Sequence, residues 1–128
     1  MKVHGGALVG PDGKTLPLST AIEVDGFLFV SGQLALRNGR IEGDVAAQTE
    51  EVFDNILAIL AQAGLGLENV IKTTVWLTDP ADFTTFNTVY AARFFAPYPA
   101  RSCVISQLVL PDARLEIEVV ASRDHRRT

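Results

Sequence analysis

The residues of this chain best suited to chemistry lie in two apolar segments near its end. Arg101 opens the segment 101–109, and Glu116 interrupts the apolar residues of 115–121. A guanidinium can hold a carboxylate or phosphate through two parallel hydrogen bonds, and a carboxylate can orient water or accept a proton. Each residue also has a plainer interpretation: Arg101 as a solvated strand end, Glu116 on the wet face of a sheet. Taken singly, both residues favour the plainer interpretation.

The remaining residue types exclude several kinds of active site. His4 and His125 lie near the two ends of the chain, where order is least expected, so no catalytic triad or Cys–His pair is indicated. Cys103, the single cysteine, is most simply a small buried apolar residue. The sequence has neither metal-ligand spacing nor a phosphate-binding glycine loop, so we expect no metal and no cofactor.

Composition limits the partners of the protein. The chain has 128 residues and a net charge of −4, and 48% of it is hydrophobic. This length suits one domain, 1–128, and an apolar surplus favours an oligomer. The acidic balance argues against nucleic acid as a partner. One cysteine, no signal peptide and no membrane-spanning apolar run predict a cytoplasmic protein with no membrane partner.

Turn and capping signals organise the first half of the chain. Asp25-Gly26, between two apolar runs, is typical of a β-hairpin, and Asn38-Gly39 predicts a second one. Apolar residues close to a 3.6-residue period predict a helix over 44–63, capped by its first residue, Asp44.

The second half predicts a strand, a helix and two further strands. Residues 69–77 are rich in β-branched side chains, and Asp79-Pro80 then starts a helix. This helix is expected to bury its apolar and aromatic residues, Phe83, Phe86, Val89, Tyr90 and Phe94. The order βββαβαββ predicts an α+β fold with a mixed sheet and both helices on one face.

The final strands, 101–109 and 115–121, are expected to pair across the turn at Pro111-Asp112, and a solvated basic tail, 123–127, follows them. Strand alternation places Arg101 and Cys103 on one face. With this pairing, Arg101 and Glu116 would lie about 20 Å apart along the sheet. One subunit could then hardly bring both to a small substrate, so a shared site would need two subunits.

The assembled segments resemble the reactive-intermediate (enamine/imine) deaminase family, also called the YjgF or Rid family. The similarity covers nearly the whole chain, and its most specific part is 99–104 together with 115–118. The other matching segments are Phe29–Gln33, 48–64, Asn69–Leu77 and Phe86–Tyr90.

The resemblance implies a chorismate-mutase-like single domain and a homotrimer with clefts between its subunits. It also implies hydrolysis of 2-imino and 2-enamino acids to 2-keto acids and ammonia, without metal or cofactor. Arg101 would bind the substrate carboxylate, and Glu116 would orient or activate water. Other positions that the resemblance places in the cleft are Ser31, Gly32, Asn87 and Cys103.

One position departs from the family pattern. Where relatives usually carry a tyrosine that reaches the cleft, this chain has Leu18. The change favours a more apolar substrate side chain or weak activity. Two alternatives stay open: binding of a keto acid or similar carboxylate without turnover, and endoribonuclease activity, which the acidic charge makes the weakest.

Overall fold

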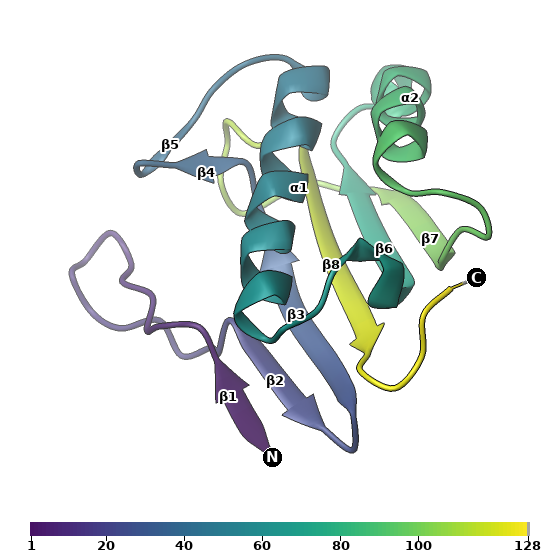
Figure 1. Ribbon diagram of the computed structural model, residues 1–128. Coiled ribbons are helices and arrows are strands. Elements are labelled where there is room, and N and C mark those ends of the chain that lie inside the picture. The colour runs from purple at the N-terminus through teal and green to yellow at the C-terminus, as the bar shows by residue number, and fades with distance from the viewer. Residues whose placement is uncertain (128) are drawn as a thin grey trace.

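The computed structural model describes residues 1–127 as a mixed sheet covered on one face by two helices (Figure 1). Six strands form the sheet in the order β1-β2-β3-β8-β6-β7, and the hairpin β4-β5 lies outside it. The strands are β1 Lys2–His4, β2 Ala21–Val24, β3 Phe27–Gln33, β4 Leu36–Arg37, β5 Arg40–Ile41, β6 Val70–Leu77, β7 Ala100–Ile105 and β8 Leu115–Ser122. The helices are α1 Val45–Gln62 and α2 Phe83–Arg93, with 3-10 turns at Leu67–Asn69 and Pro80–Asp82. The predicted fold class is confirmed.

Turn chemistry accounts for both early hairpins, as predicted. Asp25 and Gly26 have φ angles of 51° and 80°, the left-handed conformation that a type I′ turn requires. Asn38 and Gly39, between β4 and β5, have φ angles of 53° and 75°. Each short strand pair is therefore set by its own turn residues.

Helix α1 begins where its capping residue predicts. The carboxylate of Asp44 accepts a hydrogen bond of 2.9 Å from the backbone N–H of Ala47. Gly64, with a φ of 75°, follows the last turn and lets the chain leave the helix. The helix packs its apolar side on the sheet through Val52, Phe53, Ile56, Ile59 and Leu60. No helix in the described part of the chain is long and apolar enough to span a bilayer.

Helix α2 follows a 3-10 turn that Asp79 caps and Pro80 opens. Phe86, Tyr90 and Phe94 are buried as predicted, but Phe83 is 42% exposed. The expectation that Phe83 points inward was wrong because its ring lies beside Arg101 of the edge strand β7, beyond which the described sheet has no further strand.

The predicted pairing of the last two strands was wrong. β7 pairs in parallel with β6, and β8 lies between β3 and β6. The α2 crossover delivers β7 to the outer side of β6, and the segment 106–114 then carries the chain back to the sheet interior. Gln48, which is buried, fixes this segment by accepting from the N–H of Arg114 and donating to the carbonyl of Asp112. β8, five of whose eight residues are buried, thereby takes an interior position in the sheet.

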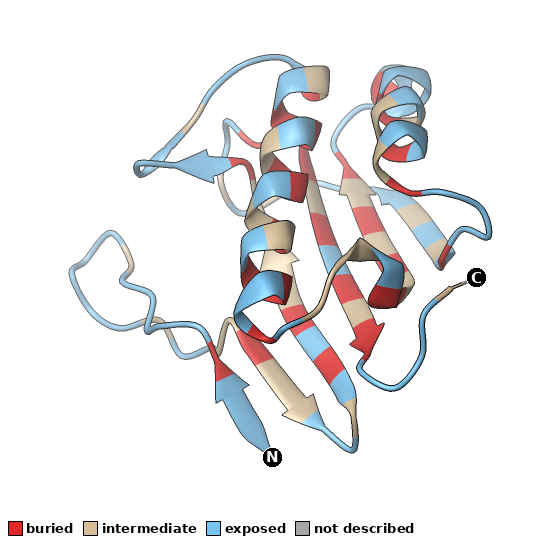
Figure 2. Ribbon diagram, in the orientation of Figure 1, coloured by how far each residue is buried: buried red, intermediate tan, exposed pale blue. Residues whose placement is uncertain are grey.

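The face of the sheet opposite the helices is uncovered. Along β3, buried and exposed residues alternate, with Leu28 and Val30 facing the helices (Figure 2). Phe29, on the other face, is 47% exposed, and Val104 of β7 is 45% exposed. Trp76 of β6 and Glu116 of β8 are paired on adjacent strands, and both lie on this uncovered face between Phe29 and Val104.

Two segments predicted to be loose are held by side-chain contacts. His4 belongs to β1 and is buried, with its Nε2 2.9 Å from Oε1 of Glu23. Arg123, predicted to lie in a solvated tail, donates two hydrogen bonds of 2.7 and 2.8 Å to the same carboxylate. Both expectations were wrong because they judged order by distance from a chain end, whereas Glu23 of β2 binds both residues.

The substitution Glu23→Gln is expected to remove an acid-sensitive part of the stability. Hydrogen bonds from Arg123 and then His4 lower the pKa of Glu23 from 4.5 to about 2. Because this pKa is lower in the folded state, the stabilisation is present above pH 4.5 and disappears as the pH falls toward 2. In urea unfolding at pH 7, the free energy of unfolding of the variant should be roughly 1 kcal/mol below that of wild type. At pH 3 this difference should be smaller. A loss independent of pH would contradict this assignment.

Candidate active site

Arg101 lies on the helix-facing side of the edge strand β7. It pairs with Thr73 of β6, whose hydroxyl is 2.8 Å from the hydroxyl of Tyr90 on α2. Nη1 of Arg101 donates to Oδ1 of Asn87 at 2.8 Å. The guanidinium carbon lies 4.8 Å from the centre of the Tyr90 ring. The side chain is therefore fixed by α2 and is not a solvated strand end.

The guanidinium borders a cavity of about 370 Å³, large enough for a small organic acid. Its lining residues are Asn87, Tyr90, Ala91, Tyr98, Pro99 and Arg101. Within residues 1–127, no carboxylate forms an ion pair with Arg101. The N–H groups not used by Asn87 can therefore receive an incoming carboxylate in bidentate fashion.

The carboxylate of Glu116 lies on the uncovered face of the sheet, opposite Trp76 of β6. The side chain is half-buried, and burial, followed by repulsion from Glu118, raises its pKa. A raised pKa brings a carboxyl closer to the neutral range in which proton exchange with substrate is effective.

Gly32 of β3 provides the space in which Glu116 lies. A Cβ atom placed on Gly32 would lie 2.9 Å from Cδ of Glu116 and closer still to Oε1. The register of β3 against β8 shifts between Val30 and Gln33, so Gly32 sits in an irregular stretch. Such irregularities often accompany functional sites because they redirect side chains. The glycine within the strand was the sequence signal available for this irregularity.

Ser31 ties the N-terminal loop to the same stretch of β3. Its hydroxyl donates to the carbonyl of Ser19 at 2.6 Å, and its N–H donates to the carbonyl of Thr20 at 2.9 Å. Leu18, one residue before this contact, is 46% exposed. The loop therefore leaves an apolar side chain exposed one residue before its anchor on β3.

Cys103 shares the helix-facing side of β7 with Arg101, as predicted from strand alternation. It packs against the hydrophobic core, and burial raises the pKa of its thiol, although the nearby Arg101 acts in the opposite direction. The thiol is therefore protonated at neutral pH, which suits a small core residue better than a nucleophile.

The structure brings the sequence-predicted residues together in two groups rather than one. Arg101 and Asn87 meet on the helix side, while Ser31, Gly32 and Glu116 gather on the uncovered side. On β6, the partners of Arg101 and Glu116 are Thr73 and Trp76, which are about 10 Å apart. The separation along the sheet is therefore about 10 Å and not the expected 20 Å. The two side chains are still kept apart in one protomer, because they lie on opposite faces of the sheet.

Tyr90 and Tyr98 are the cavity residues that the sequence did not single out. Tyr90 was predicted only as a core residue, and its position three residues after Asn87 on α2 was the available signal. Tyr98 precedes Pro99 in the connection to β7 and is 52% exposed. Both rings border the cavity beside the guanidinium.

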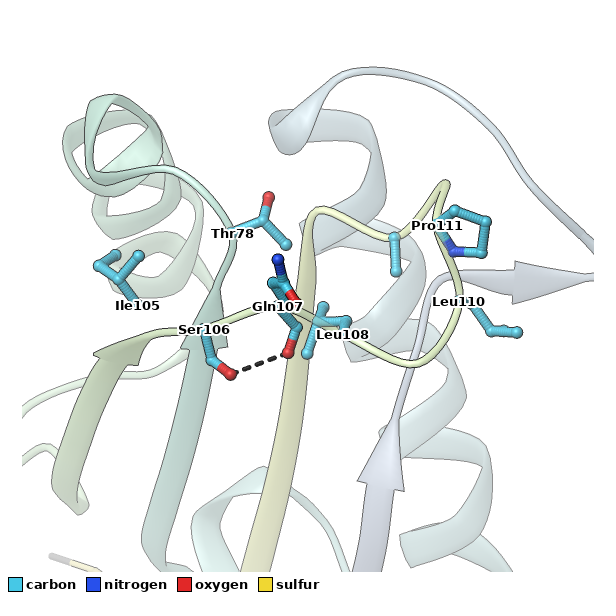
Figure 3. A pocket seen from close by; sticks show the side chains of 8 residues that line it. Thr78, Ile105, Ser106, Gln107, Leu108, Leu110 and Pro111 are labelled. Atoms are coloured by element: carbon cyan, nitrogen blue, oxygen red, sulfur yellow. Dashed lines mark hydrogen bonds between the residues drawn. The ribbon is translucent and has the colours of Figure 1, made fainter.

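A separate cavity of about 440 Å³ lies at the ends of β6 and β7 (Figure 3). Its lining is formed by Thr78, Ile105, Ser106, Gln107, Leu108, Leu110, Pro111 and Ala113. None of these side chains titrates, and the hydroxyl of Ser106 donates to the carbonyl of Gln107 at 2.8 Å. The Arg101 cavity is thus the better candidate for acid recognition.

Comparison with known proteins agrees with this architecture. The family model described as Endoribonuclease L-PSP matches residues 13–123. The 2-iminobutanoate/2-iminopropanoate deaminase of Escherichia coli (strain K12) is 38% identical over 112 residues, covering 84% of this chain and 88% of that protein. The crystal structure of RidA from the Antarctic bacterium Psychrobacter sp. PAMC 21119 has a TM-score of 0.84 and 32% identity, covering 95% of this chain and 99% of that one.

The crystal structure of E. coli TdcF with bound serine has a TM-score of 0.83 and 34% identity, covering 96% of this chain and 99% of that one. These structural similarities define the class of the protein, which is an α+β fold with two helices on one face of a mixed sheet. The chain belongs to the reactive-intermediate deaminase family, also called the Rid or YjgF family. The resemblance seen in the sequence is thereby confirmed.

Proposed function

We propose that this protein hydrolyses 2-imino acids and their 2-enamino tautomers to 2-keto acids and ammonia. The observation that carries the proposal is the Arg101 guanidinium, which is fixed by Asn87 and Tyr90 beside a cavity sized for a small acid. The deaminase name of the E. coli relative and the serine bound to TdcF support a substrate with a carboxylate. Arg101 binds that carboxylate in bidentate fashion.

The site is proposed to form at clefts between the subunits of a homotrimer. Arg101 and Glu116 lie on opposite faces of one sheet, so each needs a neighbouring protomer to meet the other. The uncovered sheet face carries Phe27, Phe29 and Val104 at 39%, 47% and 45% exposure, which suits burial against another copy.

The hydrolysis needs only water and one carboxyl group that exchanges protons. With the substrate carboxylate held by Arg101, Glu116 of a neighbouring protomer orients a water molecule toward the imine carbon and accepts its proton. A C–O bond forms while the C=N π electrons move to the imine nitrogen, which takes the water proton from the Glu116 carboxyl. Glu116 then accepts the hydroxyl proton of this carbinolamine and passes it to the nitrogen, so that the C–N bond breaks, ammonia leaves and the keto group forms.

Leu18 sets the proposed preference for the substrate side chain. It lies next to the loop contact made by Ser31, is partly exposed and offers no hydrogen bond through its side chain. A site bordered by this residue favours imines with apolar side chains, such as 2-iminobutanoate, over those with polar ones.

Semicarbazide trapping of an imine tests the proposal. An amino-acid oxidase generates 2-iminopropanoate or 2-iminobutanoate, and the protein should lower the yield of the trapped product. An unchanged yield would contradict deamination. Calorimetric binding of 2-oxobutanoate without imine hydrolysis would instead select the carboxylate-binding alternative.

The same assay, applied to oligomers that mix two variants, tests whether each cleft takes its residues from two subunits. At substrate concentrations near or below the wild-type KM, the Arg101→Ala and Glu116→Gln proteins are each expected to be nearly inactive. Refolded together in equal amounts, they should recover about a quarter of wild-type activity, because random mixing leaves both groups intact in that share of shared clefts. No recovery in verified mixed oligomers would contradict a cleft that takes one residue from each neighbour.

A further inference from the structure

Arg127 is held against the body of the protein by backbone carbonyls. Nε donates to the carbonyl of Val70 at 2.6 Å, and Nη2 donates to that of Leu67 at 2.9 Å. Nη1 donates to the carbonyls of Phe95 at 2.9 Å and of Pro97. One guanidinium therefore connects the start of β6 with the loop that follows α2. The sequence had placed this residue in a solvated tail.

The same loop forms a wall of the Arg101 cavity. Arg127 binds the carbonyls of Phe95 and Pro97, and Pro97 directly precedes the cavity residues Tyr98 and Pro99. Residues 95–98 are exposed, so few packing contacts hold this stretch. The hydrogen bonds from Arg127 are thus a principal restraint on its position.

A pair of tilted aromatic rings also connects the two arginines. The Arg127 guanidinium lies 5.1 Å from the centre of the Phe94 ring, and the rings of Phe94 and Tyr90 are 4.8 Å apart. The Arg101 guanidinium lies 4.8 Å from the centre of the Tyr90 ring, the second ring of this pair. A shift of Phe94 would therefore change the surface on which Arg101 rests.

We propose that Arg127 is a positioning residue for the acid-binding cavity. It fixes the loop 94–99, and through Phe94 and Tyr90 it fixes the guanidinium of Arg101. The inference rests on the proposed function, because the cavity is taken to hold the substrate carboxylate. Arg127 itself does not touch the substrate.

Three variants test this role: Arg127→Ala, Arg127→Lys and, as a matched control, Arg126→Ala, which changes a neighbouring exposed arginine. In Arg127→Ala without ligand, the rate of backbone amide hydrogen exchange should rise about tenfold in peptides that cover 94–99. The rate in peptides that cover α1 should stay unchanged. In the imine assay, KM should rise about fivefold while kcat stays within about twofold of wild type. Arg127→Lys should fall in between, since an ammonium has fewer donors to serve four carbonyls, and Arg126→Ala should match wild type.

Two results would overturn the role of Arg127. The first is an amide exchange rate over 94–99 that is the same in Arg127→Ala as in wild type. The second is faster exchange over 94–99 in this variant together with an unchanged KM. If Arg127→Ala does not fold, Arg127→Lys decides by the same two measurements. A wild-type protein that does not hydrolyse imines would overturn the proposed function. The exchange measurement, together with the dissociation constant for 2-oxobutanoate, would then decide the role of Arg127.

Discussion

Arg101→Ala is expected to lower kcat/KM for 2-iminobutanoate by about 10²- to 10³-fold. A bidentate arginine–carboxylate contact contributes two charge-assisted hydrogen bonds, and their loss corresponds to roughly 3–4 kcal/mol of transition-state stabilisation. Most of this loss should appear in KM, because the substrate carboxylate is bound equally in the ground state and the transition state. Initial rates over a range of substrate concentrations separate the two parameters.

Arg101→Lys serves as the matched variant for this prediction. It keeps the positive charge but cannot form a fork with a carboxylate, so its kcat/KM should lie between those of wild type and alanine. Circular dichroism and thermal unfolding should confirm that both variants fold, because Arg101 also contacts Asn87 and Tyr90. Alanine and lysine variants as active as wild type would show that the guanidinium is not the acid anchor.

Gly32→Ala is expected to reduce kcat by about 100-fold. The new Cβ would occupy the space of the Glu116 carboxylate, which must move away from its position over β3. Gly32 is not among the described glycines with positive φ, so alanine suits its backbone and the cost arises from the side-chain collision. The measurement is kcat together with the free energy of unfolding, which should fall by about 1–2 kcal/mol.

Two controls isolate the collision from a general effect of alanine. Gly6 also lacks positive φ and has nothing within 4 Å of a Cβ, so Gly6→Ala should leave kcat unchanged. Glu116→Asp moves the carboxylate closer to its own backbone. It should lower the free energy of unfolding less in the Gly32→Ala background than in wild type, with a coupling energy of about 1 kcal/mol. Strictly additive stabilities would indicate that Gly32 acts through something other than Glu116.

The sequence predicted those parts of the fold that depend on neighbouring residues. The Asp25-Gly26 and Asn38-Gly39 turns adopt positive φ for local steric reasons, and Asp44 caps α1 with its own carboxylate. The order of the strands was less accessible. The choice between a β7–β8 hairpin and a β6–β7 parallel pair depends on how α2 and the segment 106–114 pack, which local patterns do not encode.

The candidate site was predicted in part for the same reason. Arg101, Asn87 and Glu116 were recognisable by residue type and motif, and Arg101 and Asn87 are in contact. The supports of the site were missed because they are long-range contacts. Arg127 reaches the carbonyl of Val70, 57 residues away, just as Arg123 reaches Glu23, 100 residues away, elsewhere in the fold. Nothing in the neighbourhood of either arginine indicates its partner.

The placement of Arg101 and Glu116 on opposite faces of the sheet makes folding and catalytic competence separate properties. In the proposed trimer, a solitary folded protomer contains every residue that the reaction needs, yet it cannot apply them to one molecule. A substitution at Phe29 on the uncovered face could abolish turnover at low protein concentration without unfolding a protomer, and higher concentration would restore it. Melting temperature alone would therefore be a poor measure of function in variants of this protein.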